Sequence, residues 1–151
     1  MPSRSRRSVK QSTTSTPISK GPDEAVAPLL ALIEALPEAR LKHAFTHASW
    51  ALSRSDSYER LEFLGDSVLG LAIAQDLYER FPDFAEGQLA KVRAHVVSRQ
   101  SCAMVGKRLG LGGLFAEHAA DIDREEVSRL AGNRNVLAAL VEACLGSLYM
   151  E

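Results

Sequence analysis

Three carboxylates occur at helical spacing in one segment of the sequence. Glu59, Glu62 and Asp66 are three and four residues apart, which aligns them along one side of an α-helix. Acidic side chains stacked on a largely apolar helix repel each other and resist burial. A divalent cation would offset this, because Mg²⁺ prefers carboxylate and water oxygens. A solvated acidic face balanced by Arg60 and nearby basic groups is the alternative, and spacing alone leaves both open.

A fourth carboxylate lies near the end of the chain. Glu142 is the only charged side chain in the apolar segment VLAALVEACLGSLYM. A lone carboxylate in such a helix is costly unless it pairs with a cation or binds a metal. A salt bridge to Arg134 or Arg93 would satisfy it without a metal. If Glu142 instead meets Glu62 and Asp66, the three would form an oxygen-rich site suited to Mg²⁺ and to phosphodiester hydrolysis.

The elements that must position these carboxylates are predicted to be helices. Apolar residues recur at helical spacing from residue 23 nearly to the end, and no segment shows sustained β alternation. We therefore expect an all-α fold with six or seven helices. They cover about 24–36, 41–45, 58–81, 86–97, 98–109, 123–130 and 136–151.

Capping and breaking residues set the expected helix boundaries. Asp23, Ser98 and Asn135 are suited to cap the first, fifth and last helices. Pro37 and Pro82 would stop the two helices that precede them. The glycines at 110, 112 and 113 are expected to end the fifth helix.

The composition is that of an ordinary one-domain globular protein. The chain has 151 residues, of which 46% are hydrophobic and 25% charged. It has no apolar run long enough to cross a bilayer and no secretory signal, so we expect no membrane association and a cytoplasmic location. Cys102 and Cys144 lie in apolar helical contexts without metal-ligand spacing. We expect buried thiols in a reducing compartment.

Charge is unevenly distributed along the chain. Residues 1–22 are rich in Ser, Thr and basic groups, and we expect a disordered basic tail there, followed by one domain over 23–151. The tail could contact phosphates or be a passive extension, and both interpretations stay open. The first 24 residues hold five basic and two acidic groups, which leaves a net charge of −4 for the rest. A net negative charge on the folded domain is unusual for a protein that binds a polyanion such as nucleic acid.

The segment around the first three carboxylates resembles a family signature. ERLEFLGDS at 59–67 is similar to the signature of the ribonuclease III family, nearly residue for residue. Three further segments resemble family motifs in the same order, so the match covers about 25–151 and is far more specific than a lone short motif. They are AFTHASW at 44–50, FPDFAEGQLAKVRAHVVS at 81–98 and VLAALVEACLGSLY at 136–149.

The resemblance implies a ribonuclease III catalytic domain. Such domains are all-helical endonucleases that act as homodimers on double-stranded RNA, in ribosomal and messenger RNA processing, with Mg²⁺ or alternatively Mn²⁺. By position, Glu62, Asp66 and Glu142 match the family's metal ligands, and Asp66 and Glu142 match its two catalytic carboxylates. Glu59 and Glu86 match acidic positions of the active-site valley, where a salt bridge or a role facing RNA is an equal alternative.

Three further residues match family positions. The resemblance assigns Phe63 and Leu64 to the dimer interface, and simple core packing is the alternative. His47 matches the segment that precedes the signature, and we interpret it as structural.

The sequence departs from the family pattern in two respects. Ala139 stands three residues before Glu142, where the family carries an acid on the same helix face. Three explanations are open. Water or another acid such as Glu86 takes the place of the missing ligand; the protein is a catalytically impaired RNA-binding or scaffold member of the family; or the residue was replaced to trap a complex. The chain also ends at Glu151, where we expect a truncation before the last nuclease helix and the double-stranded-RNA-binding domain.

Overall fold

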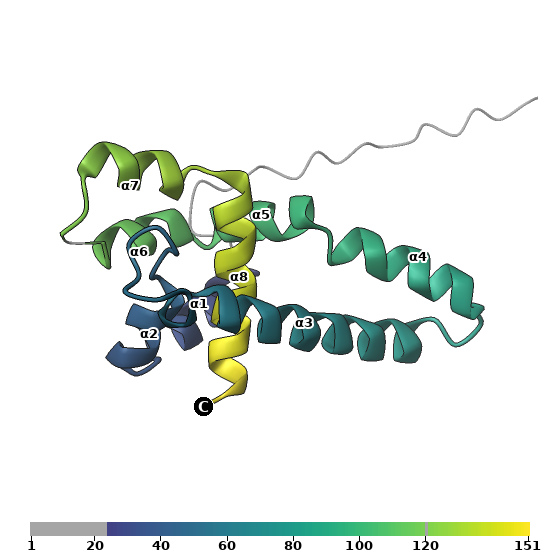
Figure 1. Cartoon of the computed structure of the whole chain (residues 1–151). Coiled ribbons are helices and arrows are strands. Elements are labelled where there is room, and N and C mark those ends of the chain that lie inside the picture. The colour runs from purple at the N-terminus through teal and green to yellow at the C-terminus, as the bar shows by residue number, and fades with distance from the viewer. Residues whose placement is uncertain (1–23, 120) are drawn as a thin grey trace, which may run out of the picture.

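Eight α-helices and one short 3-10 helix form the described part of the chain, residues 24–119 and 121–151, in the computed structural model (Figure 1). This part contains no strand, so the prediction of an all-α fold is confirmed. The helices are α1 (Ala27–Glu34), α2 (Glu38–Ala44), η1 (Arg54–Asp56), α3 (Glu59–Arg80), α4 (Glu86–Val96), α5 (Arg99–Arg108), α6 (Leu111–Glu117), α7 (Arg124–Ala131) and α8 (Arg134–Tyr149).

The C-terminal helix α8 forms the centre of the core. Its apolar residues are buried on nearly every face, as the absence of a polar stripe in its sequence predicts. Helices α3 and α5 pack against it most extensively, α3 through the turns around Leu61 and Gly65, and α8 crosses α3 in Figure 1. The two segments that carry the candidate carboxylates therefore meet at one helix crossing.

Two glycines allow α3 and α8 to approach each other unusually closely. A Cβ atom at Gly65 would overlap the carbonyl oxygen of Glu142, and one at Gly146 would overlap the carbonyl oxygen of Leu61. The two backbones are therefore in direct contact, which only glycine permits at these positions. This contact sets the turn of α3 that holds Glu62 and Asp66 against the turn of α8 that holds Glu142.

The second half of α3 and the whole of α4 form an arm that extends away from α8 (Figure 1). Leu77 is buried in this half of α3, whereas α4, which lies wholly within the described residues, has no buried side chain. Glu86 begins α4, and the side chain of Gln88 caps that helix by accepting a hydrogen bond from the Ala85 N–H at 3.0 Å. The arm thus has little core of its own.

The structure corrects two of the expected boundaries. Gly110 follows the end of α5, but Gly112 and Gly113 lie inside an additional helix, α6. Gly112 is needed there for packing, because a Cβ atom at this position would be only 2.6 Å from the carbonyl oxygen of Ala131 in α7. Asn133, not Asn135, caps α8, since its side chain accepts hydrogen bonds from the N–H groups of Asn135 and Val136.

Other local predictions are confirmed. Ser98 caps α5 by accepting from the Ser101 N–H, and Cys102 and Cys144 are buried free thiols. The prediction that Asp23 caps the first helix is wrong, because α1 begins at Ala27 with Val26 in the N-cap position and no side-chain cap. Asp23 itself and the tail over 1–22 lie outside the described residues. No helix in the described part of the chain is long and apolar enough to span a membrane.

Candidate active site

Three carboxylates lie at the crossing of α3 and α8. Glu62 and Asp66 are one turn apart on α3, and Glu142 comes from the middle of α8. Glu142 is only 6% exposed, Glu62 is half-buried, and Asp66 is open to solvent. The group thus extends from the core to the surface.

The electrostatics of the crossing show that the three carboxylates act on one another. Burial raises the pKa of Glu142 to about 7, and the charges of Asp66 and then Glu62 contribute in the same direction, against the opposing charge of Arg99. Burial also raises the pKa of Glu62, against the opposing charge and hydrogen bonding of Arg99 and with smaller raising contributions from Glu59 and Asp66. A negative charge at this crossing is therefore costly without a cation.

Glu142 has no protein partner that would offset this cost. Its carboxylate makes no hydrogen bond and no ion pair within residues 24–119 and 121–151, so the salt bridge to Arg134 or Arg93 considered above is absent. In the same residues no fully buried side-chain polar atom lacks a hydrogen-bond partner, so the Glu142 oxygens retain contact with solvent. A solvent ligand can therefore reach them.

The donor set fits a hard divalent cation in its chemistry. Carboxylate oxygens from Glu62, Asp66 and Glu142 are the ligands that Mg²⁺ and Mn²⁺ prefer, and their mutual repulsion would be relieved by such an ion. Their present side-chain positions do not form a finished cage, because no three His, Cys, Asp or Glu side chains in the described ranges are gathered closely enough to hold a metal. The side chains would have to turn toward an ion.

Ala139 lies one helical turn before Glu142 and is 3% exposed. Its methyl group offers no ligand where an acid on this face of α8 would have extended the group. The structure does not bring Glu86 to this position within one chain. Glu86 is exposed at the outer end of the arm, where it lines a hollow of about 240 Å³ with Tyr78 and Arg93.

Sequence reasoning missed two residues beside the carboxylates. The guanidinium of Arg99 on α5 lies 3.6 Å from Glu62, measured from Nη2 to Oε1. Burial raises the pKa of the Cys102 thiol to about 11, and the charges of Glu142 and Asp66 contribute in the same direction. Both come from α5, and only the packing of α5 on α8 brings them here.

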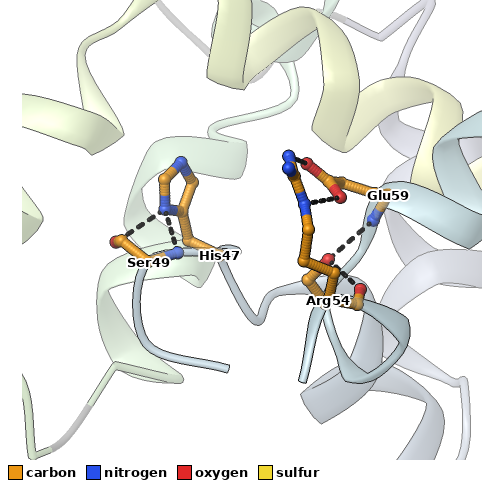
Figure 2. A network of polar contacts seen from close by, with 5 residues as sticks. His47, Ser49, Arg54 and Glu59 are labelled. Carbon is orange, nitrogen blue, oxygen red and sulfur yellow. Dashed lines mark hydrogen bonds and ion pairs between the residues drawn. The ribbon is translucent and has the colours of Figure 1, made fainter. Parts of the chain in front are cut away.

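Glu59 makes a salt bridge away from the crossing. Figure 2 shows the Arg54 guanidinium donating two hydrogen bonds to its carboxylate, from Nη2 to Oε1 at 2.7 Å and from Nε to Oε2 at 3.0 Å. The bond from Arg54 lowers the pKa of Glu59. The salt bridge considered for Glu59 is therefore present in the structure.

His47 has a structural setting. Its Nδ1 accepts a hydrogen bond from the Ser49 N–H at 3.1 Å and lies 2.8 Å from the Ser49 hydroxyl (Figure 2). The ring packs among Trp50, Tyr58 and Phe115. Burial lowers the pKa of His47, which disfavours the charged form.

Phe63 and Leu64 lie on the outer surface of α3. Phe63 is 79% exposed, which excludes simple core packing as its role. Both residues line an open hollow of about 760 Å³ together with Arg40, His43 and Met150, among others. A large exposed aromatic ring beside a hollow is typical of an interaction surface.

Comparison with known proteins agrees with the motifs and the fold. The family of Ribonuclease-III-like proteins matches residues 38–151. Ribonuclease 3 of Mycolicibacterium smegmatis is 47% identical over 131 residues, covering 85% of this chain and 56% of the relative. Ribonuclease 3 of Idiomarina loihiensis is 41% identical over 111 residues, covering 74% of this chain and 45% of the relative. The chain thus spans about half the length of the curated relatives it matches.

A solved structure shares the fold. The nuclease domain of a ribonuclease III from Campylobacter jejuni, described for structural flexibility in a region involved in dimer formation, has a TM-score of 0.69 and 32% identity. The match covers 83% of this chain and 85% of that one. With the ordered motifs, the helical fold and the family match over residues 38–151, the chain belongs to the ribonuclease III family.

Proposed function

We propose that this chain is the catalytic domain of a divalent-metal-dependent endoribonuclease that cleaves double-stranded RNA in the cytoplasm, in ribosomal and messenger RNA processing. One observation carries the proposal. Glu142 is a buried carboxylate without a protein partner, and it shares a glycine-mediated helix crossing with Asp66 and Glu62. A fold that keeps so costly an arrangement is best explained by a cation that binds there.

Asp66 and Glu142 are proposed as the catalytic carboxylates, with Glu62 as the third metal ligand. Mg²⁺ or Mn²⁺ bound there would supply a polarised water and stabilise charge on the phosphate. The backbone contact at Gly65 and Gly146 would hold the two sets of ligands at a fixed separation. The buried residues around Glu142 would limit the solvent that reaches its side of the site, while the exposed Asp66 would be accessible to an RNA phosphate.

A homodimer is the proposed assembly. Phe63 exposes most of its ring beside the hollow that it lines with Leu64, and Leu71 and Tyr78 expose further apolar surface along α3. A second copy would bury this surface, and the Campylobacter jejuni nuclease domain has a region involved in dimer formation. A dimer would also bring the arm of one subunit, with Glu86, near its partner.

Cleavage of a perfect RNA duplex by the purified chain tests the proposal. We expect cleavage with Mg²⁺ or Mn²⁺ and its loss in Glu142→Gln, a variant of nearly equal shape that keeps the helix packing. Circular dichroism would show that the variant is folded. If the folded wild-type dimer cuts no duplex at any concentration of either metal, the proposed activity is wrong.

A non-catalytic RNA-binding or scaffold protein is the second candidate, considered because Ala139 stands where the family carries an acid. Loss of one anionic ligand should weaken cation binding. Installing the acid by Ala139→Asp separates the two candidates. An active site that is only short of a ligand should cut faster or at lower Mg²⁺ in the variant. A scaffold would bind duplex RNA without cutting it, independently of Glu62 and Asp66.

A further inference from the structure

Arg99 is the basic residue that pairs with the carboxylates of the crossing. It is the first residue of α5, and the Ser98 side chain fixes the start of that helix by accepting a hydrogen bond from the Ser101 N–H. Its guanidinium forms the only ion pair, within the described residues, that involves Glu62, Asp66 or Glu142. The backbone of Arg99 is therefore anchored while its charge points to the carboxylates.

The geometry of the Arg99–Glu62 pair is that of a weak contact, which Glu62 could give up in order to bind another cation. The Arg99–Glu62 distance is 3.6 Å with side chains 52% and 22% exposed. The Arg54–Glu59 pair is more exposed, at 81% and 36%, but it is held at 2.7 Å through two hydrogen bonds. A long, half-exposed ion pair is weak. Glu62 can therefore leave Arg99 at little cost when a stronger cation arrives.

We propose that Arg99 is the internal counter-cation of the α3–α8 carboxylates: it pairs with Glu62 while the site is free of metal, and a divalent cation displaces it from Glu62. The inference rests on the function proposed above. It makes Arg99 a positioning residue, because it acts on the metal site through Glu62.

Competition follows from the charges. The guanidinium stays protonated at any physiological pH, so it repels a divalent cation bound to the same carboxylates. Ala139 strengthens the effect, because three carboxylates rather than four must hold the cation against this repulsion. Removing the Arg99 charge should therefore strengthen metal binding, although it destabilises the metal-free protein.

Mn²⁺ binding to the full chain without RNA, measured from the electron paramagnetic resonance signal of free Mn²⁺, tests the proposal. We expect Arg99→Gln to bind Mn²⁺ about fivefold tighter than the wild type, as a screened charge several ångströms away would allow. Arg99→Lys keeps the charge and should bind within about twofold of the wild type. Lys107→Gln is the matched control, since exposed Lys107 lies on the same helix and its loss changes the net charge equally.

Thermal unfolding in EDTA provides a second readout. Arg99→Gln should melt at a lower temperature than the wild type without metal, and saturating Mn²⁺ should raise its melting temperature by more. Lys107→Gln should change neither value. A lost structural contact alone would lower both melting temperatures without the larger metal response.

The outcomes separate this inference from the proposed function. If Asp66→Asn abolishes Mn²⁺ binding but Arg99→Gln binds no tighter than Lys107→Gln, the role of Arg99 is wrong and the metal site stands. If Mn²⁺ binding is absent or unaffected by Asp66→Asn, the proposed metal site fails, and the inference fails with it.

Discussion

The two halves of α3 differ in what surrounds them. The first half lies against α8 so closely that Gly65 has no room for a side chain, and it carries Glu62 and Asp66. The second half packs on α4 in the arm, where a Cβ atom at Gly70 would meet nothing within 4 Å and where Leu71 and Tyr78 are exposed. One helix thus combines a closely packed half that positions the carboxylates with a second half that exposes apolar side chains to solvent.

The candidate site differs from the rest of α3 in the burial of its acids rather than in their number. The second half of α3 also carries acids, but Asp76 pairs with Arg80 and Glu79 accepts a hydrogen bond from Gln75, all at the surface. Such groups are well solvated and exert little mutual strain. Only the acids at the crossing repel one another around a buried carboxylate.

The largest expected effect is the loss of RNA cleavage when an acid in the first half of α3 is replaced, compared with an acid in the second half. Asp66→Asn should slow single-turnover cleavage of duplex RNA about a thousandfold, because it removes a proposed metal ligand. Glu79→Gln, an equal change of charge on the second half, should stay within about twofold of the wild type. Equal losses in the two variants would show that general acidity, rather than the crossing, supports activity.

A second prediction compares glycines. Gly146→Ala should destabilise the fold by about 3 kcal/mol in urea unfolding, because its methyl group would overlap the carbonyl oxygen of Leu61 and force the helices apart. Gly70→Ala should instead stabilise by about 0.5–1 kcal/mol, since alanine favours the helix and open space receives its methyl group. Similar free energies for both variants would contradict the close approach.

The pH dependence of stability gives a third prediction, for the metal-free chain in EDTA. The pKa of Glu142 is about 7 in the folded protein against an ordinary 4.5, so the folded state binds more protons between these values. Stability should therefore fall as pH rises from about 4.5 to about 7, by on the order of 3 kcal/mol. Glu142→Gln should remove this decline, so the difference between the two pH profiles isolates the group. Parallel profiles would mean that Glu142 is not under electrostatic strain.

The smallest effect concerns the proposed dimer. Phe63→Ala should raise the dimer dissociation constant about tenfold in analytical ultracentrifugation, since the exposed ring stands beside a hollow suited to a partner. Leu52→Ala is the control, because Leu52 is fully exposed but lies in the loop before η1. A Phe63→Ala variant that dimerises as tightly as Leu52→Ala would place the interface elsewhere.

Local signals in the sequence predicted most of the fold. Apolar periodicity indicated the helices, and Ser98 caps its helix as expected because a cap depends only on neighbouring backbone. Helix α6 escaped prediction because Gly112 serves a distant contact with Ala131 rather than a turn. From the sequence alone, these glycines are equally consistent with the end of a helix and with close packing against another helix, and only the position of α7 distinguishes the two.

The candidate site was predictable only in part. Helical spacing placed Glu62 and Asp66 together, and the family resemblance suggested that Glu142 joins them. Arg99 carried no signal, because its meeting with Glu62 depends on how α5 packs against α8. Gly65 and Gly146 stood inside apolar helices, where glycine indicates a close backbone approach, and that signal was available in the sequence.

The most direct test of the account is a crystal structure with Mn²⁺, located by its anomalous scattering. We expect a peak at the α3–α8 crossing with oxygens of Asp66 and Glu142 about 2.0–2.6 Å from the ion. Glu62 should then have turned from Arg99 toward the ion. A saturated crystal with no peak at this crossing, or with Glu142 still without a partner, would contradict it.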